Sequence, residues 1–275
     1  MRKINKLHIE DHISQQLADK QNEINRGDKN PHWSLSRDEK HEIWDKLLTS
    51  QQYLCAYCEC EIQLNPDKNF HIEHFYERHD FPDRIYDYDG NLILSCQGDT
   101  ERQVISETNA QQRERVENIS CGHKKSNSYH NQQDVDYQML LSPMDDIEHL
   151  FGYPDGKMEA MPNCTEDEVV KINYTLHRLN LGSQKLNNRR LEMILAVEHE
   201  LRTLPEALQI ELVADLLNLE QEKLPNYFSA IKDNFEYLLE FKDLELPETE
   251  IRKIQIQNQN LIQNQNQLYK ILKTL

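Results

Sequence analysis

The pattern of apolar and polar positions divides the 275-residue chain into three regions. In the first, residues 1–50, the sequence Ser36-Arg37-Asp38-Glu39 has the form of a helix capping box. Apolar side chains then recur on one helical face, at Ile43, Trp44, Leu47 and Leu48. This pattern predicts a helix of about 14 residues. The preceding stretch, residues 22–33, is polar and contains a glycine and a proline, which predicts a loop or an arm.

The second region, residues 51–163, carries the strand signals. The short run from His71 to Phe75 alternates apolar and polar residues, which predicts a strand. A turn-forming sequence at residues 88–91 precedes the apolar run Leu92-Ile93-Leu94, which predicts a second strand. Residues 97–120 have the composition of a polar insertion.

A hairpin and a set of helices follow. Residues 148–153 and 157–161 flank Pro154-Asp155-Gly156, and this arrangement predicts a β-hairpin. The third region, residues 164–275, begins with a capping box at Thr165-Glu166-Asp167-Glu168, and Gly182-Ser183 ends one helix and starts the next. About four or five helices are expected here.

Apolar residues recur every seventh position near the end of the chain. They are Ile254, Leu261, Leu268 and Leu275. The residues four positions after the first three are Asn258, Gln265 and Leu272, so amides interrupt the stripe. This pattern is typical of a coiled-coil seam or a helix laid on a partner, and equally of a terminal helix packed on its own domain. Low-complexity disorder is a third interpretation.

Composition supports a mostly helical α+β fold. Glycine (7) and proline (9) are scarce, while Leu, Glu, Gln, Asn and Lys are abundant. We therefore expect a small β-containing core between an N-terminal helical segment and a C-terminal helical domain. The sequence has no apolar run of about 18 residues and no apolar signal-peptide core, so a cytoplasmic protein without a membrane span is expected. In a reducing cytosol the six cysteines are not expected to form disulfides, and the close spacing of several of them indicates metal ligation instead.

The chain is strongly acidic. It has 48 acidic and 31 basic residues and a net charge of −17. From His71 to His130 there are 11 acidic and 7 basic residues, so the formal charge of that segment is 7 − 11 = −4. Such a balance disfavours unassisted binding to a phosphate backbone. If the chain acts on nucleic acid, we expect a partner to deliver or hold it.

The cysteines have the spacing of zinc ligands. Cys55-x-x-Cys58 is a tight knuckle that presents two thiolates, and a four-coordinate structural zinc needs two more ligands. Cys96, at the end of the second predicted strand, and Cys121, at the start of a predicted helix, are the best candidates. The alternative is that Cys96 is an ordinary core residue. The two remaining cysteines are expected to be ordinary small side chains: Cys60 and Cys164.

A second set of residues has the chemistry needed for phosphodiester hydrolysis, which requires a base to activate water and a cation to stabilise developing charge. Glu73 can bind a metal ion and His74 can accept a proton. On a strand these neighbours point to opposite faces, which suits separate roles. His123 and Asn127 share a helical face and can complete the metal site. Asn91 can hydrogen-bond across the loop and hold His74 in position.

The order of these motifs resembles a known family. Cys-x-x-Cys, Glu-His, Asn-Leu-Ile-Leu-Ser-Cys and Cys-Gly-His-Lys-Lys resemble the motifs of the HNH (ββα-metal) endonucleases. Within that family the chain looks like the PtuB-type nucleases of Septu and retron-associated anti-phage systems. Residues 40–130 carry the diagnostic match. The predicted hairpin, Leu179-Asn180-Leu181-Gly182 and Asn188-Arg189-Arg190 are also similar to that subgroup.

The resemblance implies a role for each motif residue. His74 would be the general base and Asn91 the orienting asparagine, while Glu73 and His123 would bind one divalent ion, Mg²⁺ or Mn²⁺. The four cysteines would bind the zinc that stabilises the ββα-metal core. His71 is left with a supporting or incidental role.

One departure from the family pattern affects the last ligand. Many zinc-containing HNH enzymes have the final histidine directly after the final cysteine, whereas here Gly122 stands in that place and His123 follows. The metal ligand is therefore His123, Asn127 or both. Lys124 and Lys125 are expected either to contact phosphate or to lie on a solvated helix face.

The resemblance also implies a partner. PtuB-like proteins act beside a PtuA-like ATPase, and a reverse transcriptase with its noncoding RNA would accompany the system if it is a retron. No Walker A pattern occurs in this sequence, so ATP hydrolysis would belong to the partner. A partner of this kind agrees with the acidic charge of the chain.

Two functions from different classes remain. The first is a nuclease subunit that cuts DNA, or RNA such as tRNA, within a defence complex. The second is a zinc-stabilised interaction subunit whose catalytic site has decayed and which regulates or scaffolds the ATPase. The presence of Glu73, His74, Asn91 and His123 favours the first.

Overall fold

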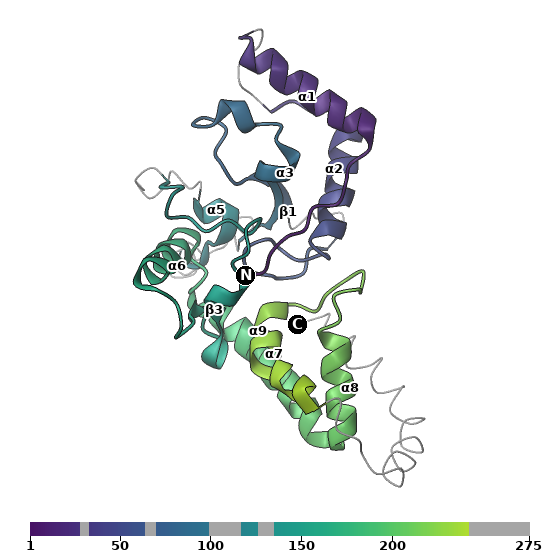
Figure 1. Ribbon diagram of the computed structural model, residues 1–275, viewed down its shortest axis with the longest axis vertical. Helices are drawn as coiled ribbons and strands as arrows, with labels where there is room; N and C mark the ends of the chain where they lie inside the picture. Colours follow the sequence, from purple (N-terminus) through teal and green to yellow (C-terminus); the bar gives the residue numbers. More distant parts are fainter. Residues whose placement is uncertain (28–32, 64–69, 99–116, 126–134, 242–275) are drawn as a thin grey trace, which may run out of the picture.

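The computed structural model describes residues 1–27, 33–63, 70–98, 117–125 and 135–241. Within these ranges the fold is mostly helical α+β with two small antiparallel sheets. Figure 1 shows an elongated molecule with α1 (Asp11–Asn25) and α2 (Arg37–Ser50) at one end and α7 (Gln184–Thr203), α8 (Glu206–Leu216) and α9 (Phe228–Phe235) at the other. The sheets and the two helices α5 (Cys121–Lys125) and α6 (Glu166–Leu179) lie between these ends.

The first sheet contains the two strands predicted from the alternating and apolar runs. β1 (Phe70–His74) and β2 (Leu92–Cys96) pair antiparallel, with Phe70 opposite Cys96 and His74 opposite Leu92. Every residue of β2 is buried, because α2 and α5 both pack against this strand. The turn predicted before β2 is a single helical turn, α3 (Tyr88–Asn91), capped by the Asp87 carboxylate.

The second sheet confirms the predicted hairpin. β3 (Phe151–Gly152) and β4 (Glu159–Ala160) pair antiparallel, with Phe151 opposite Ala160. Two short 3₁₀ helices border the first strand, η3 (Glu148–Leu150) before it and η4 (Pro154–Gly156) after it. The second of these carries the turn that the proline and glycine predicted.

Helix α2 begins and ends as its sequence predicts. The Ser36 hydroxyl accepts a hydrogen bond from the Glu39 backbone, and the Glu39 carboxylate accepts one from the Ser36 backbone. Just after the helix, the buried Gln51 side chain donates to the carbonyls of Leu54 and Leu94 and accepts from the Leu94 N–H. Gln51 therefore fixes the end of α2 to β2, which carries one of the candidate zinc ligands.

The stretch predicted as a loop before α2 is partly helical. Helix α1 continues to Asn25, and its buried residues Ile13 and Leu17 lie one turn apart on the face toward the core. Gln21 fixes this helix to the 3₁₀ helix η1 (Pro82–Arg84), since its side chain donates to the Pro82 carbonyl and accepts from the Tyr86 N–H. Ile13 and Leu17 join the hydrophobic core and Ile24 packs against it, so α1 is held by apolar contacts as well as by Gln21.

The third region is helical where the structure describes it. Thr165 and Glu168 form the predicted capping box of α6, and Ser183 caps α7. Between these helices Asn180 adopts the left-handed conformation and ends α6. A last 3₁₀ helix, η5 (Glu236–Phe241), follows α9.

Buried apolar residues from all three sequence regions join one core, whose members run from Met1 to Phe235. Among the described residues, no helix is long and apolar enough to cross a membrane. Most of the predicted polar insertion and the whole heptad-like stripe lie outside the described residues.

Candidate functional site

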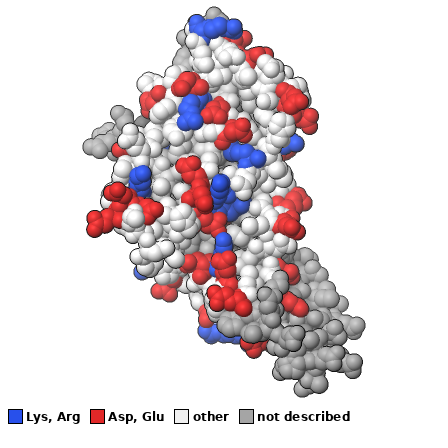
Figure 2. Space-filling model, viewed as in Figure 1, with Lys and Arg blue, Asp and Glu red and all other residues white. Residues whose placement is uncertain are grey.

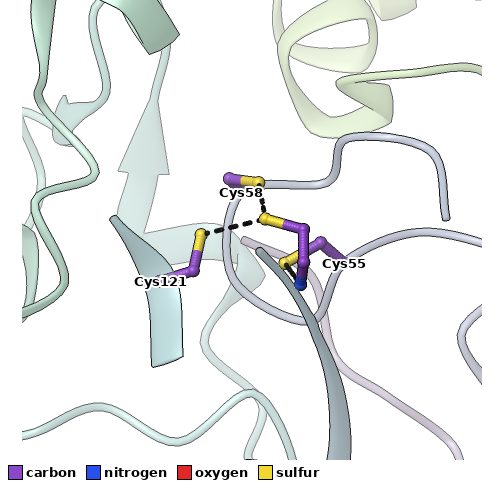
Figure 3. Close-up of side chains that lie close together, drawn as sticks. Cys55, Cys58 and Cys121 are labelled. Atoms are coloured by element: carbon purple, nitrogen blue, oxygen red, sulfur yellow. Dashed lines mark hydrogen bonds between the residues drawn. The ribbon is translucent and has the colours of Figure 1, made fainter. Parts of the chain in front are cut away.

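Four cysteines converge at the centre of the molecule. Cys55 and Cys58 come from the loop after α2, Cys96 ends β2 and Cys121 starts α5. Their sulfur atoms all lie within 4.8 Å of one another, and all four residues are buried. Figure 3 shows the labelled thiols of Cys55, Cys58 and Cys121 turned toward a common point. The Cys96 thiol belongs to this cluster, so the cluster brings together all four predicted ligands.

The spacing of the sulfur atoms suits zinc. The Cys58 and Cys121 sulfurs each lie 3.7 Å from the Cys96 sulfur. Four thiolates arranged tetrahedrally about Zn²⁺, each about 2.3 Å from the ion, would lie about 3.8 Å apart. The cluster can therefore hold a structural zinc ion with little movement of its side chains.

Local backbone conformation brings the first two thiols together. Glu59 has a positive φ of 63°, and its N–H donates to the Cys55 carbonyl, which closes the chain into a tight knuckle. The Ala56 N–H donates to the Leu94 carbonyl and so holds the knuckle beside β2. The knuckle is also tied to α9, because the Ser229 backbone and hydroxyl both donate to the Glu59 carboxylate.

The two other cysteines differ from each other. Hydrogen bonding with the Cys55 thiol first, and then with the Cys58 and Cys96 thiols, raises the pKa of Cys60 well above its usual range. Cys60 is thus a neighbour of the cluster, although it is not one of the four residues whose sulfurs lie close together. The Cys164 thiol donates to the Leu150 carbonyl and lies outside the cluster.

A second cluster of polar side chains lies beside the first, between β1 and α5. Glu73 is buried, with one carboxylate oxygen, Oε1, 2.5 Å from the Lys125 ammonium nitrogen. The other oxygen, Oε2, lies 3.2 Å from Nε2 of His71. The rings of His71 and His123 have centroids 4.5 Å apart. The structure thus places His123 beside His71, which contacts Glu73, and adds Lys125 to this cluster.

Charge rather than burial decides the state of Glu73. Burial alone would raise its pKa, but the Lys125 ammonium and the His71 ring outweigh burial and lower the pKa of Glu73 to about 2. Burial, followed by the neighbouring His71, lowers the pKa of His123. The cluster therefore presents an ionised carboxylate and a neutral imidazole, which are the forms that bind metal ions.

Lys125 is an internal cation. The residue is 1% exposed, and its ammonium donates to the carbonyls of His74 and Phe75 as well as facing Glu73. Neither expectation for this residue, phosphate contact or a solvated helix face, was right. A five-residue helix is too short for its pattern to reveal which face is buried, and this ammonium finds its partners only in the folded protein.

His74 points to the opposite face of β1. Its Nε2 lies 3.0 Å from the Ile85 carbonyl oxygen. A carbonyl only accepts, so Nε2 must carry the proton, and Nδ1 is the nitrogen left to accept one. The Trp33 ring contacts the imidazole edge-on, with ring centroids 4.8 Å apart. Burial, with a further contribution from Arg78, lowers the pKa of His74 to about 4, so the ring is neutral at pH 7.

Asn91 acts on His74 through the backbone between them. Asn91 is 0% exposed; its amide donates to the carbonyls of Tyr76 and Arg84, and its carbonyl oxygen accepts from the Tyr76 N–H. None of the hydrogen bonds recorded for the described residues joins Asn91 to His74 directly. Asn91 instead holds the loop whose Ile85 carbonyl orients His74.

The predicted last ligands are only partly described. His123 is half-buried, and its buried Nε2 makes no hydrogen bond with any residue that the structure describes. Asn127 lies outside the described residues. The sequence analysis undervalued His71 and Lys125. The signal for His71 was its position two residues before Glu73, which puts both side chains on the same face of β1. Lys125 carried no such signal, because its helix has only five residues.

The exposed charge shows no broad basic surface on the face drawn in Figure 2, where acidic side chains are interspersed with fewer basic ones. Comparison with protein-family models gives no match, and neither does comparison with curated proteins. Evidence for function therefore comes from the two clusters.

Proposed function

We propose that this protein is a metal-dependent endonuclease of the HNH type, which hydrolyses phosphodiester bonds in DNA or in RNA such as tRNA. The observation that carries the proposal is the contrast between two neighbouring residues of β1. Glu73 is an ionised carboxylate inside a cluster of metal-ligating side chains, and His74 on the opposite face is a neutral imidazole fixed by a backbone carbonyl. A hydrolytic site needs both, a ligand for a cation and a base for water.

Different residues of the chain would accept the proton, position the base and bind the metal ion. His74 accepts a proton from the attacking water at Nδ1, because its Nε2 is committed to the Ile85 carbonyl. Asn91 keeps that carbonyl in place by holding the loop from Tyr76 to Arg84. Glu73 and His123 would hold a divalent ion, which stabilises negative charge on the leaving oxygen when bound. The four-cysteine cluster keeps β2 and α5 together, so that the two ligands stay side by side.

The arrangement of elements supports the finer family assignment. The antiparallel pair β1–β2 followed by the short helix α5, packed on β2, has the order of a ββα-metal core. The motif order that resembles the PtuB-type nucleases runs through these three elements.

The charge of the chain supports action within a complex. With a net charge of −17 the protein repels a phosphate backbone, so a second subunit must supply much of the binding. We propose that this subunit is a PtuA-like ATPase and that the complex acts against phage. The chain would then act in the cytoplasm as its nuclease subunit.

Cleavage by the purified assembly tests the proposal. Plasmid DNA and tRNA are incubated with the complex that contains the wild-type chain or His74→Ala, in the presence of Mg²⁺ or Mn²⁺. We expect the wild-type complex to cut one of the substrates and the variant to cut it at least about 10²-fold more slowly, the typical contribution of a general base. Equal cleavage by both complexes, or none by either, would instead support the zinc-stabilised interaction subunit.

A further inference from the structure

The face of β1 that carries Glu73 has a feature that the motif order did not reveal. His71 and Glu73 are two residues apart on one strand, so their side chains lie on the same face. His71 Nε2 and Glu73 Oε2 are 3.2 Å apart. Two atoms that bind one metal ion at about 2.1 Å each are about 3.0–3.4 Å apart in octahedral or tetrahedral geometry. The pair therefore has the spacing of two ligands of a shared ion.

Both ligand atoms face the position of Gly122 on α5. A Cβ atom added there would lie 2.6 Å from Glu73 Oε2 and 3.1 Å from His71 Nε2. Gly122 does not have a positive φ, so the backbone conformation does not require glycine at this position. The absence of a side chain matters for the space it leaves, which lies directly beside the two ligand atoms.

A third ligand comes from the next residue. His123 has a ring centroid 4.5 Å from that of His71, and its buried Nε2 makes no hydrogen bond with a described residue. The Lys125 ammonium faces Glu73 Oε1, so the carboxylate is anchored on one side and presents only Oε2 to the gap. The imidazole of His71 and one carboxylate oxygen of Glu73 thus flank the space beside Gly122, and the His123 ring lies next to that of His71.

We propose that His71, Glu73 and His123 together bind one divalent transition-metal ion, with His71 as a full ligand and Gly122 as the residue that leaves room for the ion. Two imidazole nitrogens favour ions such as Mn²⁺, Co²⁺, Ni²⁺ or Zn²⁺ over Mg²⁺, which prefers oxygen ligands and keeps most of its water. The assignment of this ion to catalysis rests on the proposed nuclease function. The binding of the ion does not.

Electron paramagnetic resonance of added Mn²⁺ measures this site directly, because bound Mn²⁺ loses the sharp signal of the free ion. The full chain is used with zinc retained in the cysteine cluster, since Mn²⁺ competes poorly for thiolates. We expect His71→Ala to weaken Mn²⁺ binding by more than about tenfold. Loss of a residue that only hydrogen-bonds a metal ligand already costs about tenfold or more in metal affinity, and loss of a ligand should cost more. About a tenfold excess of Mg²⁺ should leave most of the Mn²⁺ bound to the wild-type chain.

Two further variants separate ligation from general damage. Gly122→Ala adds a methyl group on α5 that would occupy the space beside His71 and Glu73. This variant is also expected to weaken Mn²⁺ binding. The matched control is His8→Ala, because His8 Nε2 and Asp11 Oδ1 are also 3.2 Å apart but lie exposed at the surface. It should bind Mn²⁺ like the wild type. Zinc content and thermal unfolding identify any variant that fails to fold, and His71→Gln then replaces His71→Ala.

The outcomes for binding and for cleavage are independent. Wild-type Mn²⁺ affinity in both His71→Ala and Gly122→Ala, or no Mn²⁺ binding by the wild type, would overturn the site. Displacement of Mn²⁺ by an equal amount of Mg²⁺ would overturn its selectivity. If the His71-dependent site is found but the assembly cuts neither plasmid nor tRNA, the metal site stands and the nuclease function fails. If the assembly cuts plasmid or tRNA but Mn²⁺ affinity does not depend on His71, the nuclease function stands and the proposed metal site fails.

Discussion

The two clusters of metal-ligating side chains lie side by side and differ in almost every physical respect. The cysteine cluster has four ligands of one kind, all buried and within 4.8 Å of one another. The cluster of His71, Glu73 and His123 mixes imidazole and carboxylate, and its two histidines are half-buried. Four thiolates close the coordination of zinc, whereas three ligands leave positions open for water or substrate. The cysteine cluster is therefore suited to stabilising the fold, whereas the cluster of His71, Glu73 and His123 is suited to binding water or substrate.

The neighbours of each cluster differ in the same way. The cysteine knuckle is tied to α9 by the hydrogen bonds between the Glu59 carboxylate and Ser229. Two lysines support the elements around the second cluster. Lys125 supports the Glu73 face, while Lys6 donates to the carbonyls of Tyr88 and Leu92, and Leu92 lies opposite His74. Loss of these supports should therefore affect the fold to different degrees.

The largest effect is expected from the cysteine cluster. Cys58→Ser removes one zinc ligand, and because binding of structural zinc is coupled to folding, the variant should lose most of its folding free energy. Thermal unfolding and zinc content measure both consequences. Cys164→Ser is the matched control, since this thiol lies outside the cluster, and it should retain one zinc ion and melt close to the wild type. Normal zinc content in Cys58→Ser would remove this residue from the ligand set.

A smaller but still large effect is expected from Lys125→Met. The substitution leaves the Glu73 carboxylate buried without its cation and two backbone carbonyls without a donor, at a cost of about 3–5 kcal/mol in the free energy of unfolding. Denaturant unfolding with zinc in excess measures this cost. Lys124→Met, at the neighbouring half-buried lysine, should change the free energy of unfolding by less than about 1 kcal/mol.

A double-mutant cycle shows whether the cost of Lys125→Met comes from the ion pair. Adding Glu73→Gln removes the stranded charge, so the double variant should be more stable than the sum of the two single changes by about 1–3 kcal/mol. Strict additivity would mean that Lys125 stabilises the protein only through the two carbonyls.

The second lysine gives a pH-dependent effect of the next size. Burial lowers the pKa of Lys6 to about 7, although Asp89 and Asp87 act to raise it. A lowered pKa means that the unfolded chain holds the proton at pH values where the folded chain releases it. Stability should therefore be lowest below pH 7 and rise as the pH increases from 7 toward the unfolded pKa of 10.5. Each pH unit between the two pKa values adds about 1.4 kcal/mol to the free energy of unfolding, so the whole increase amounts to a few kcal/mol.

Chemical unfolding between pH 7 and 10 tests this effect. Lys6→Met should remove the rise, whereas the exposed Lys3→Met should retain it. A wild-type slope in Lys6→Met would show that another group titrates in this range.

Local signals in the sequence predicted much of this fold. The capping boxes at Ser36 and Thr165 are read from four consecutive residues each, and the structure contains both helices. The hairpin strands around Pro154 and the convergence of the four cysteines were also predicted, because turn chemistry and zinc coordination both constrain spacing. Helix α1 was missed: its few apolar positions are widely spaced, and its Gln21 contacts join it to a loop some sixty residues away.

The second cluster was predicted only in part for a similar reason. Glu73 and His123 follow from the motif, but the value of His71 depends on how α5 lies against β1. The two elements are about fifty residues apart, and no periodic pattern in a five-residue helix determines which side chains face the strand. For the same reason the inward direction of Lys125 became visible only in three dimensions.

The smallest effect on stability is expected from the residue with the largest expected effect on cleavage. His74→Ala removes one hydrogen bond to the Ile85 carbonyl and one edge-on contact with Trp33, which together stabilise the fold by about 1–2 kcal/mol. Zinc content should be unchanged, because His74 lies on the face of β1 away from Glu73. A melt as low as that of Cys58→Ser would make His74 a structural residue and contradict its role as a base. A near-normal melt together with lost cleavage would show that the two faces of a single strand serve separate purposes.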